Sequence, residues 1–326
     1  MTDIPRASWP RTLKLLIPVA IFVIIFTQSA NAGRAHQESQ TAPPKTQAEI
    51  RAISLAPHLT ELMFTAGAGP HLVGVVEWSD YPEAALKLPR IGDAFRFDIE
   101  RIVALDTTHA LAWTGGTPMA AVQQLESLGV EVIAVEIQTL DDISLALRRL
   151  GRLFNSAETA ERAAVAFDQQ KQTLINKRNN DPQLALFYQV SERPLFTLGA
   201  PHVINEVFAL CGARNIFDGL QTEASVVGRE AVIAAKPYAI IAGTQHETNA
   251  QNLATEMGWP EQPPLGHWGK FEQIPAITCG HAWTVDPALL VRPTPRILDG
   301  AVLLCVWIDQ IRQQSASNQA CNIDHD

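Results

Sequence analysis

Short apolar runs alternate with segments of helical periodicity in the first half of the chain. Runs of strand length lie at residues 51–55, 72–76, 110–113 and 130–135. Between them, apolar side chains recur at the three- and four-residue spacing of a helix face in three segments: 57–66, 98–105 and 118–128. Strands that alternate with helices predict a parallel sheet that is covered by helices on both faces.

The same pattern restarts after a long helical stretch. Helical spacing covers residues 139–153 and then 157–177, and the second segment contains neither Gly nor Pro. Residues 179–183 interrupt it, and the pattern then predicts a strand at 184–189, helices at 203–211 and 230–235, and a strand at 238–242. The chain is therefore predicted to form two α/β lobes joined by the helix 157–177, which is long enough to run along the molecule.

Both halves contain a short helix that begins near a glutamate and leads into a buried strand. Glu100 lies in such a segment before the strand 110–113, and Glu230 lies in one before the strand 238–242. A carboxylate in the first turn of a helix is stabilised by the helix dipole, so both glutamates have a structural explanation. The repetition also predicts two similar lobes with a cleft between them.

The N-terminus has the pattern of a secretory signal peptide. Arg6, Arg11 and Lys14 precede an uncharged apolar run at 15–26, and small residues follow at 29–32. This run is shorter than the roughly 20 residues that span a bilayer, although an uncleaved signal anchor is the alternative. We therefore expect a signal peptide at residues 1–32, a flexible lead-in at 33–50 and a mature protein in the periplasm.

Composition narrows the range of functions. The chain has 34 acidic and 25 basic residues, a net charge of −9, which argues against binding of nucleic acid. The four cysteines of an exported chain are possible disulfide partners, but their spacing does not select one of the three connectivities. No C-x-x-C sequence occurs, which argues against a thiol-redox motif or a zinc ribbon.

Motifs of catalysis and metal binding were not found in the sequence. It contains no phosphate-binding G-x-x-x-x-G-K-[ST], no G-x-S-x-G nucleophile turn and no H-E-x-x-H. The nine histidines are scattered, and none pairs with another at the i, i+4 spacing of metal ligands on a helix. We therefore expect neither catalytic residues nor a metal site.

Aromatic residues recur at one topological position, next to the ends of the predicted strands. Trp78 and Tyr81 follow the strand 72–76, Trp113 ends the next strand, and Phe95 and Phe196 lie in comparable turns. In an open parallel sheet, ligands bind outside the carboxyl ends of the strands, and flat rings there provide apolar contact area. The group favours a ligand cleft, while packing of the rings under loops is the alternative.

Nine stretches, in order over residues 51–312, carry a resemblance to a known family. They are RAISLAPHLTELMFTAGAG, LVGVVEWSDYP, DIERIVAL, LAWTGG, VQQLESLGVEV, PLFTLG, CGARNIF, VGREAVIAAKPYAII and RPTPRILDG. In these stretches the chain resembles the periplasmic substrate-binding proteins of ABC transporters for cobalamin, haem and siderophores. EWSDYP and AWTGG are most similar to the cobalamin (vitamin B12) branch.

The resemblance implies a fold and its boundaries. Class III periplasmic binding proteins have two Rossmann-like α/β lobes with parallel sheets, joined by one long rigid helix. Here the N-terminal lobe is expected at 51–154, the connecting helix at 155–180, the C-terminal lobe at 181–314 and a tail at 315–326. The ligand of such a protein lies in the cleft between the lobes.

The resemblance also implies roles for particular residues. Glu100 and Glu230 match exposed glutamates that meet arginines of the membrane permease, and Cys211 and Cys305 match a disulfide of the second lobe. Cys279 and Cys321 have no counterpart, and they either pair with each other or stay free. The expected ligand contacts are Trp78, Tyr81, Phe95, Trp113, Phe196 and Arg292.

The chain departs from the cobalamin-binding pattern at two aromatic positions. Ala94 stands where an aromatic residue is expected, with Phe95 or Phe97 as its replacement, and Ala224-Ser225 occupy the place of a tryptophan. Additional aromatic surface is expected from three rings in the segment 245–272, namely Trp259, Trp268 and Phe271.

The function implied is capture of a corrinoid without chemical change and its delivery to an ABC permease. The protein would act as a monomer with no cofactor of its own, cobalamin being its cargo. A haem-binding protein, with His58 as the candidate axial ligand, and a ferric-siderophore-binding protein are the alternatives. A metal-ion binder or an enzyme on a two-lobed scaffold has less support.

Overall fold

A computed structural model of the chain describes residues 50–177, 182–243, 267–317 and 321. The expected signal peptide, the lead-in up to residue 49 and Trp259 lie outside these residues. None of the helices in the described ranges has the length and apolar character needed to cross a membrane.

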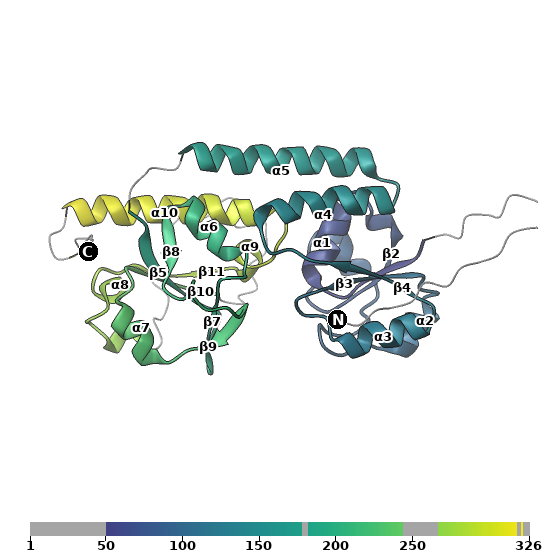
Figure 1. Cartoon of the computed structure of the whole chain (residues 1–326), viewed down its shortest axis with the longest axis horizontal. Helices are drawn as coiled ribbons and strands as arrows, with labels where there is room; N and C mark the ends of the chain where they lie inside the picture. Colours follow the sequence, from purple (N-terminus) through teal and green to yellow (C-terminus); the bar gives the residue numbers. More distant parts are fainter. Residues whose placement is uncertain (1–49, 178–181, 244–266, 318–320, 322–326) are drawn as a thin grey trace, which may run out of the picture. The chain divides into compact units, whose positions relative to one another are not determined.

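The N-terminal lobe is built on a four-stranded parallel sheet with the order β2-β1-β3-β4. Helices α1 and α4 cover one face of this sheet, and α2 and α3 cover the other (Figure 1). Their apolar side chains form a separate core cluster on each face. In chain order the elements are β1 (Ala52–Ser54), α1 (Pro57–Thr65), β2 (Leu72–Val75), α2 (Ile99–Ala104), β3 (His109–Trp113), α3 (Met119–Ser127), β4 (Glu131–Val135) and α4 (Leu140–Leu153).

Local sequence explains where these helices begin. Pro57 is the first residue of α1, a position where its missing N–H costs no intrahelical bond. Asp98 caps α2 by accepting a hydrogen bond from the backbone N–H of Arg101 at 2.9 Å. Thr139 and Asp142 form a reciprocal capping box at the start of α4. These signals account for the agreement between predicted and observed starts.

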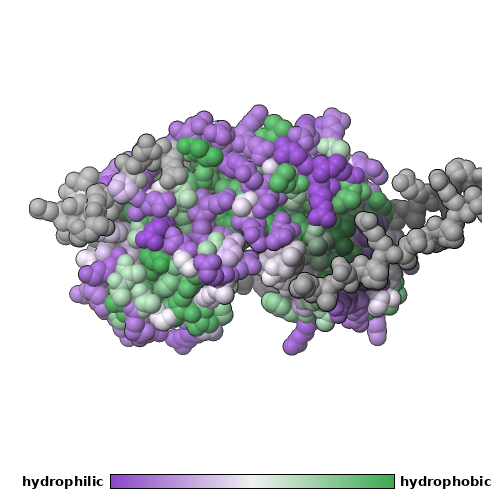
Figure 2. Space-filling model, viewed as in Figure 1, coloured by the Kyte–Doolittle hydropathy of each residue, from purple (hydrophilic) through white to green (hydrophobic). Residues whose placement is uncertain are grey.

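Helix α5 (Ala157–Lys177) connects the two lobes along the chain, with the bounds expected from its lack of Gly and Pro. Its buried residues, Ala160, Ala164, Phe167 and Leu174, form one stripe that faces the shared core. Ion pairs join it to α4 through Arg148–Glu161 and Lys171–Asp141. Hydrophilic residues predominate over α5 on the face shown in Figure 2.

The C-terminal lobe repeats this architecture. Its four-stranded parallel sheet has the order β11-β10-β5-β8, with α6 and α10 packed on one face and α7 and α8 on the other (Figure 1). Its first strand β5 lies between its second and third large strands, as β1 does in the other lobe, which confirms the prediction of similar lobes. The elements of this sheet and its helices are β5 (Leu184–Gln189), α6 (Ile204–Leu210), β8 (Ala213–Asn215), α7 (Arg229–Ala235), β10 (Ala239–Gly243), α8 (Pro275–Thr278), β11 (Ala282–Val285), α9 (Pro287–Leu290) and α10 (Ile297–Ser317).

A small antiparallel sheet in the C-terminal lobe was not predicted. It has the order β6-β7-β9 and is formed by β6 (Ser191–Glu192), β7 (Leu195–Leu198) and β9 (Ala224–Val226). Phe196 on β7 pairs with Val226 on β9. The expectation that Phe196 lies in a turn was therefore wrong, since it belongs to a strand of this sheet. Its strands are too short to give a periodic pattern in the sequence.

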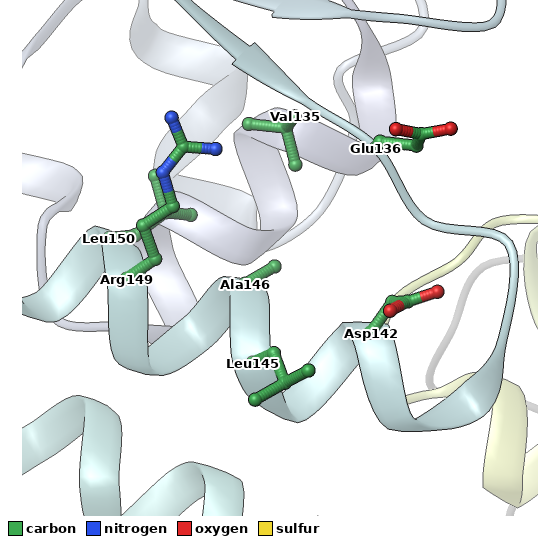
Figure 3. Close-up of a pocket in the computed structure, with 7 residues that line it drawn as sticks. All are labelled: Val135, Glu136, Asp142, Leu145, Ala146, Arg149 and Leu150. Atoms are coloured by element: carbon green, nitrogen blue, oxygen red, sulfur yellow. The ribbon is translucent and has the colours of Figure 1, made fainter.

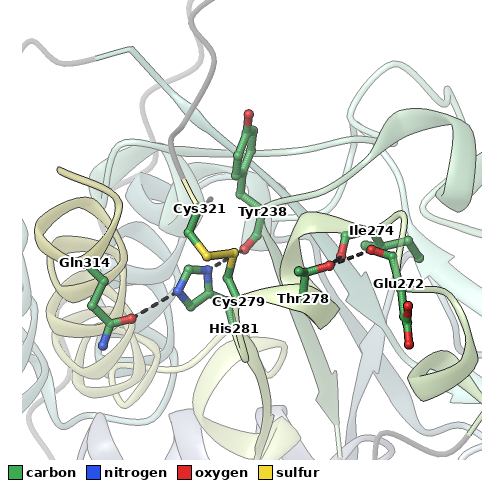
Figure 4. Close-up of a disulfide and its surroundings, with 8 residues drawn as sticks. All are labelled: Tyr238, Glu272, Ile274, Thr278, Cys279, His281, Gln314 and Cys321. Atoms are coloured by element: carbon green, nitrogen blue, oxygen red, sulfur yellow. Dashed lines mark hydrogen bonds between the residues drawn. A yellow bond between two sulfur atoms is a disulfide. The ribbon is translucent and has the colours of Figure 1, made fainter. Parts of the chain in front are cut away.

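Two disulfides tie α10 and the described residue beyond it, Cys321, to the rest of the C-terminal lobe. Cys211, which follows α6, bonds to Cys305 on α10, as the resemblance implied. Cys279 bonds to Cys321, which settles the alternatives left open by the sequence and ties the residue beyond α10 to the α8–β11 turn (Figure 4). Beside this bond, His281 contacts Tyr238 O and Gln314 Oε1 at 3.2 and 3.1 Å.

Candidate ligand site

The strand order of the N-terminal sheet reverses between β1 and β3. From β1 the chain crosses through α1 to β2 on one side, and it later returns to β3 on the other side. Ligands of open α/β sheets bind at such a reversal, outside the carboxyl ends of the two strands. His58, in the first turn of α1, and Trp113, at the end of β3, lie there with ring centroids 5.3 Å apart and planes at 89°.

Two glycines allow the indole of Trp113 to lie against its own turn. A Cβ atom on Gly116 would overlap the six-membered ring, and one on Gly115 would lie 3.0 Å from the indole nitrogen. The backbone N–H of Trp113 donates to Thr117 Oγ1 at 2.9 Å, which closes the turn. The sequence W-T-G-G therefore positions a half-buried ring at the end of β3, where it packs against the edge of the core.

Trp78 lies in the loop after β2, where the chain meets the C-terminal lobe. Its side chain is 63% exposed and its φ of 64° is in the left-handed region, while the adjacent Ser79 is buried. Arg292, which follows α9, donates to Asp80 Oδ1 at 2.6 Å and to Trp78 O at 3.3 Å. This arginine therefore contacts the EWSDYP loop from the opposite lobe.

A second arginine makes a parallel set of contacts. Arg296 donates two hydrogen bonds to the carboxylate of Glu61 on α1, at 2.9 and 2.7 Å. Its guanidinium also lies 3.8 Å from the ring centroid of Tyr81, a cation–π contact. Tyr81 and Glu61 belong to the N-terminal lobe, so both arginines of the R-P-T-P-R sequence bridge the lobes. We call the residues joined by these contacts, together with His58 and Trp113, the interlobe site.

Two histidines, the buried His58 and the half-buried His202, face this site and are neutral at pH 7. Burial, with smaller contributions from Arg292 and His202, lowers the pKa of His58 to about 3. Burial lowers the pKa of His202, in the loop before α6, to about 4. His202 Nδ1 accepts a hydrogen bond from the backbone N–H of Ile204 at 3.1 Å, whereas His58 Nε2 has no hydrogen-bond partner in the part of the chain that is described.

Glu223 brings a carboxyl group from the C-terminal lobe to the W-T-G-G turn. It lies directly before β9, and its backbone oxygen accepts from the N–H of Gly199 at 3.0 Å. Its Oε2 lies 2.9 Å from the position that a Cβ atom would take on Gly115. Burial raises the pKa of Glu223. Glu223 is therefore part of the interlobe site.

The structure brings together four of the six predicted ligand contacts. Trp78, Tyr81, Trp113 and Arg292 lie in the interlobe site through the contacts given above. Phe95 and Phe196 are not joined to it by any ring contact, ion pair or side-chain hydrogen bond within the described residues, and the Phe95 ring is 75% exposed. Their role as ligand contacts stays a prediction.

Sequence reasoning missed several members of the site. Glu61, Asp80 and Arg296 were not predicted, because each is placed by a partner far along the chain. His202 and Glu223 were not predicted either, because they reach the site only when the two lobes are folded together. Trp268 was expected to add aromatic surface, and this was wrong: it is 3% exposed, packs against Phe187 and donates to Gln189 Oε1. An apolar ring beside the buried strand β5 is more stable in the core than in solvent.

Glu100 and Glu230 occupy equivalent places in the two lobes. Each lies exposed in the first turn of a short helix, α2 or α7, and each of these helices precedes an inner strand of its sheet, β3 or β10. The repetition seen in the sequence therefore corresponds to the same structural position in each lobe.

A small pocket lies elsewhere, between the end of β4 and α4 (Figure 3). Its volume is about 180 Å³, and none of the predicted ligand contacts lines it. Asp142 there caps α4, and Arg149 donates to the carbonyl of Ala134 at 2.6 Å, so both polar side chains already serve the lobe. The pocket is too small for a macrocycle. In the described ranges, no three His, Cys, Asp or Glu side chains gather as metal ligands.

Comparison with known proteins identifies the family. The family model described as periplasmic binding protein matches residues 53–263. The chain belongs to the periplasmic binding protein family. A vitamin B12-binding protein of Pectobacterium atrosepticum is 34% identical over 272 residues, which cover 82% of this chain and 91% of that relative.

Solved structures of periplasmic binding proteins show the same fold. The periplasmic vitamin B12 binding protein BtuF of Vibrio cholerae has a TM-score of 0.69 and 32% identity, covering 80% of this chain and 96% of its own. The periplasmic heme-binding protein RhuT from Roseiflexus sp. RS-1 in apo form has a TM-score of 0.66 at 21% identity, covering 80% and 98%, and shares the fold alone. The expected class III arrangement, two α/β lobes and one long connecting helix, is confirmed.

Proposed function

We propose that this protein binds cobalamin, or a closely related corrinoid, in the periplasm and delivers it unchanged to an ABC transporter. Two comparisons support this ligand: the 34% identity to a vitamin B12-binding protein and the structural similarity to BtuF at 32% identity. Binding rather than catalysis also suits a site composed of rings, paired charges and neutral histidines.

The observation that carries the proposal is the meeting of both lobes at aromatic side chains. Trp78 and Trp113 come from the N-terminal lobe, and Arg292 reaches the Trp78 loop from the C-terminal lobe. Flat apolar rings bury the faces of a planar macrocycle at a small cost in conformational entropy, while polar groups at the edge fix its orientation. A corrin ring between the lobes would contact both kinds of group.

Calorimetric titration with cyanocobalamin tests this site. The protein, purified from the periplasm of an expressing bacterium, is expected to bind one cyanocobalamin. Trp113→Ala is expected to weaken binding by about tenfold or more, because an aromatic ring that the ligand covers contributes more than about 1.4 kcal/mol to the free energy of binding. Met119→Ala, which removes an exposed apolar side chain from α3, serves as the control and leaves the affinity unchanged. Equal affinities for the wild type and Trp113→Ala would contradict the proposed site.

Haem is the second candidate ligand, and His58 is the observation that favours it. Its Nε2 atom has no partner among the described residues, and a neutral imidazole is a common axial ligand of haem iron. A Soret band that appears on addition of haem and is lost in His58→Ala, without cyanocobalamin binding by the wild type, would favour haem over cobalamin.

We also propose that Glu100 and Glu230 contact the transporter. Their equivalent, exposed positions on α2 and α7 provide one negative charge on each lobe. Two charges at corresponding places set the orientation of docking and the rate of encounter more than its affinity. A single copy of the chain presents both glutamates, so a monomer suffices for this function.

A further inference from the structure

The positive charges of the interlobe site are already neutralised by the protein. Arg292 pairs with Asp80 at 2.6 Å, and Arg296 makes two hydrogen bonds with Glu61, whose side chain is 2% exposed. Charge-assisted pairs of this geometry hold both guanidinium groups in place. Neither arginine is therefore free to bind a carboxylate of a ligand without the loss of an existing ion pair.

The remaining titratable groups give the interlobe site one unpaired negative charge. His58 and His202 are neutral at pH 7, since burial lowers the pKa of each well below that pH. Glu223 has no ion pair and no hydrogen bond to its carboxyl group within the part of the chain that is described. Glu223 is therefore the one charged side chain, among those that the contacts above join into the interlobe site, that has no oppositely charged partner there.

Glu223 is placed where it can act on a bound molecule. Its Oε2 and the indole nitrogen of Trp113 lie 2.9 and 3.0 Å from one point, the Cβ position that Gly115 lacks. The carboxyl group therefore lies beside the ring that is proposed to stack on the ligand. It is partly exposed, so it is accessible at the edge of the site rather than sealed in the core.

Corrinoids and haem carry different polar groups at the edge of the ring, and a carboxylate interacts differently with each kind. The corrin ring of cobalamin carries carboxamide side chains, whose N–H groups donate hydrogen bonds and bear no charge. Haem carries two propionates, which are negative at neutral pH. A carboxylate accepts hydrogen bonds from amides, whereas it repels other carboxylates, and more strongly where water is partly excluded.

We infer that Glu223 is a specificity-determining residue, which accepts hydrogen bonds from peripheral amides of a corrinoid and excludes macrocycles that carry carboxylates. This inference rests on the proposed function, because it concerns which macrocycle the same site admits. It also gives a physical reason for the choice of cobalamin over haem by a fold that serves both ligand classes. Exclusion of a competitor by a like charge is a common route to selective binding.

Three ligands and three variants test the inference by calorimetry at pH 7.5. The ligands are cyanocobalamin, its monocarboxylic acids, in each of which one peripheral amide is hydrolysed, and haem. Glu223→Gln keeps the size and the hydrogen-bonding capacity but removes the charge. Glu223→Asp keeps the charge, and Glu126→Gln on the exposed side of α3 removes an equal charge away from the site. Each isomeric acid is titrated separately.

The wild type and Glu126→Gln are expected to prefer cyanocobalamin over at least one monocarboxylic acid by about tenfold or more. Glu223→Gln is expected to bind cyanocobalamin within about threefold of the wild type and to lose most of that preference, while its affinity for haem rises. Glu223→Asp is expected to retain the preference in part.

The outcomes separate the two proposals. Unchanged discrimination in Glu223→Gln, with cyanocobalamin still bound by the wild type, would overturn the role of Glu223 and leave the proposed function standing. A wild type that does not bind cyanocobalamin would overturn the proposed function itself. Equal unfolding midpoints of the variants exclude a folding defect as the source of any change.

Discussion

Arg296 and Glu61 join the two lobes through a pair of hydrogen bonds at 2.9 and 2.7 Å. The glutamate lies on α1 of the first lobe and is 2% exposed, and the arginine directly precedes α10 of the second. A buried carboxylate has lost its hydration, so it strongly destabilises the fold when its ion-pair partner is removed. The pair therefore favours one arrangement of the lobes and restricts their opening.

Breaking this pair on one side is expected to destabilise the fold by about 3–5 kcal/mol, because a buried charge loses its partner. Arg296→Met removes the positive charge with little loss of volume, and denaturant unfolding measures the effect. Glu158→Gln, which breaks the exposed Arg162–Glu158 pair on α5, is the control and should cost less than about 1 kcal/mol. Equal effects of the two substitutions would show that the Glu61 contact is not buried in solution.

Acid is expected to destabilise the protein through His58 and His202. Their pKa values in the folded state are about 3 and about 4, while their ordinary value in the unfolded chain is 6.5. The stabilisation is thus fully present above pH 6.5 and is lost as the pH falls, since the unfolded state takes up protons that the folded state excludes. Near pH 5 the two histidines together contribute a slope of about 2.5 kcal/mol per pH unit.

The measurement for these histidines is the free energy of unfolding between pH 4.5 and 7.5 in the wild type and in the double variant His58→Gln, His202→Gln. Carboxylates contribute equally to both proteins, so the difference between the slopes isolates the histidines. Identical slopes would show that the two imidazoles titrate alike in the folded and unfolded states.

Charge reversal at Glu100 and Glu230 is expected to abolish uptake without affecting ligand affinity. The permease is expected to contact these two glutamates through arginines, and a lysine at either position would repel them. Uptake of radiolabelled cobalamin is measured in cells whose own gene for this binding protein is deleted and replaced by the variant, and affinity for cobalamin is measured by calorimetry. Glu126→Lys is the control on an exposed helix. Weakened cobalamin binding in the double variant would instead place these residues in the ligand site.

Removal of the Cys211–Cys305 disulfide is expected to destabilise the C-terminal lobe. The bond closes a sequence separation of 94 residues, for which chain entropy gives an upper value of about 4–5 kcal/mol. Cys279–Cys321 closes 42 residues and joins the chain end to the lobe, so its removal should cost less. Unfolding of the two double-alanine variants compares them, and a greater loss from the second pair would contradict this order.

Much of the fold follows from local sequence. Helix α5 and strand β5 have the predicted bounds, since a helical run free of Gly and Pro ends at a clear interruption and a buried strand follows it. Helix α10 was not predicted, although its buried face is apolar. Val302 and Val306 are apolar and exposed on the same helix, which obscures the single stripe that a periodicity argument requires.

The site was predicted in part, for a different physical reason. Trp78, Trp113 and Arg292 lie in local sequences that mark strand ends or carry the family resemblance. Arg296 and Glu61 are 235 positions apart, and Glu223 meets Gly115 only once both lobes are formed. Local periodicity contains no information about such pairs, so they emerge from the tertiary structure alone.

Competition between cyanocobalamin and haem decides which macrocycle this protein binds. Equimolar amounts of both are added to the purified protein, unbound ligand is removed, and the absorption spectrum of the protein fraction is recorded. We expect a corrinoid spectrum at one cobalamin per chain and no Soret band. A Soret band without corrinoid absorption would contradict the assignment of cobalamin as the ligand.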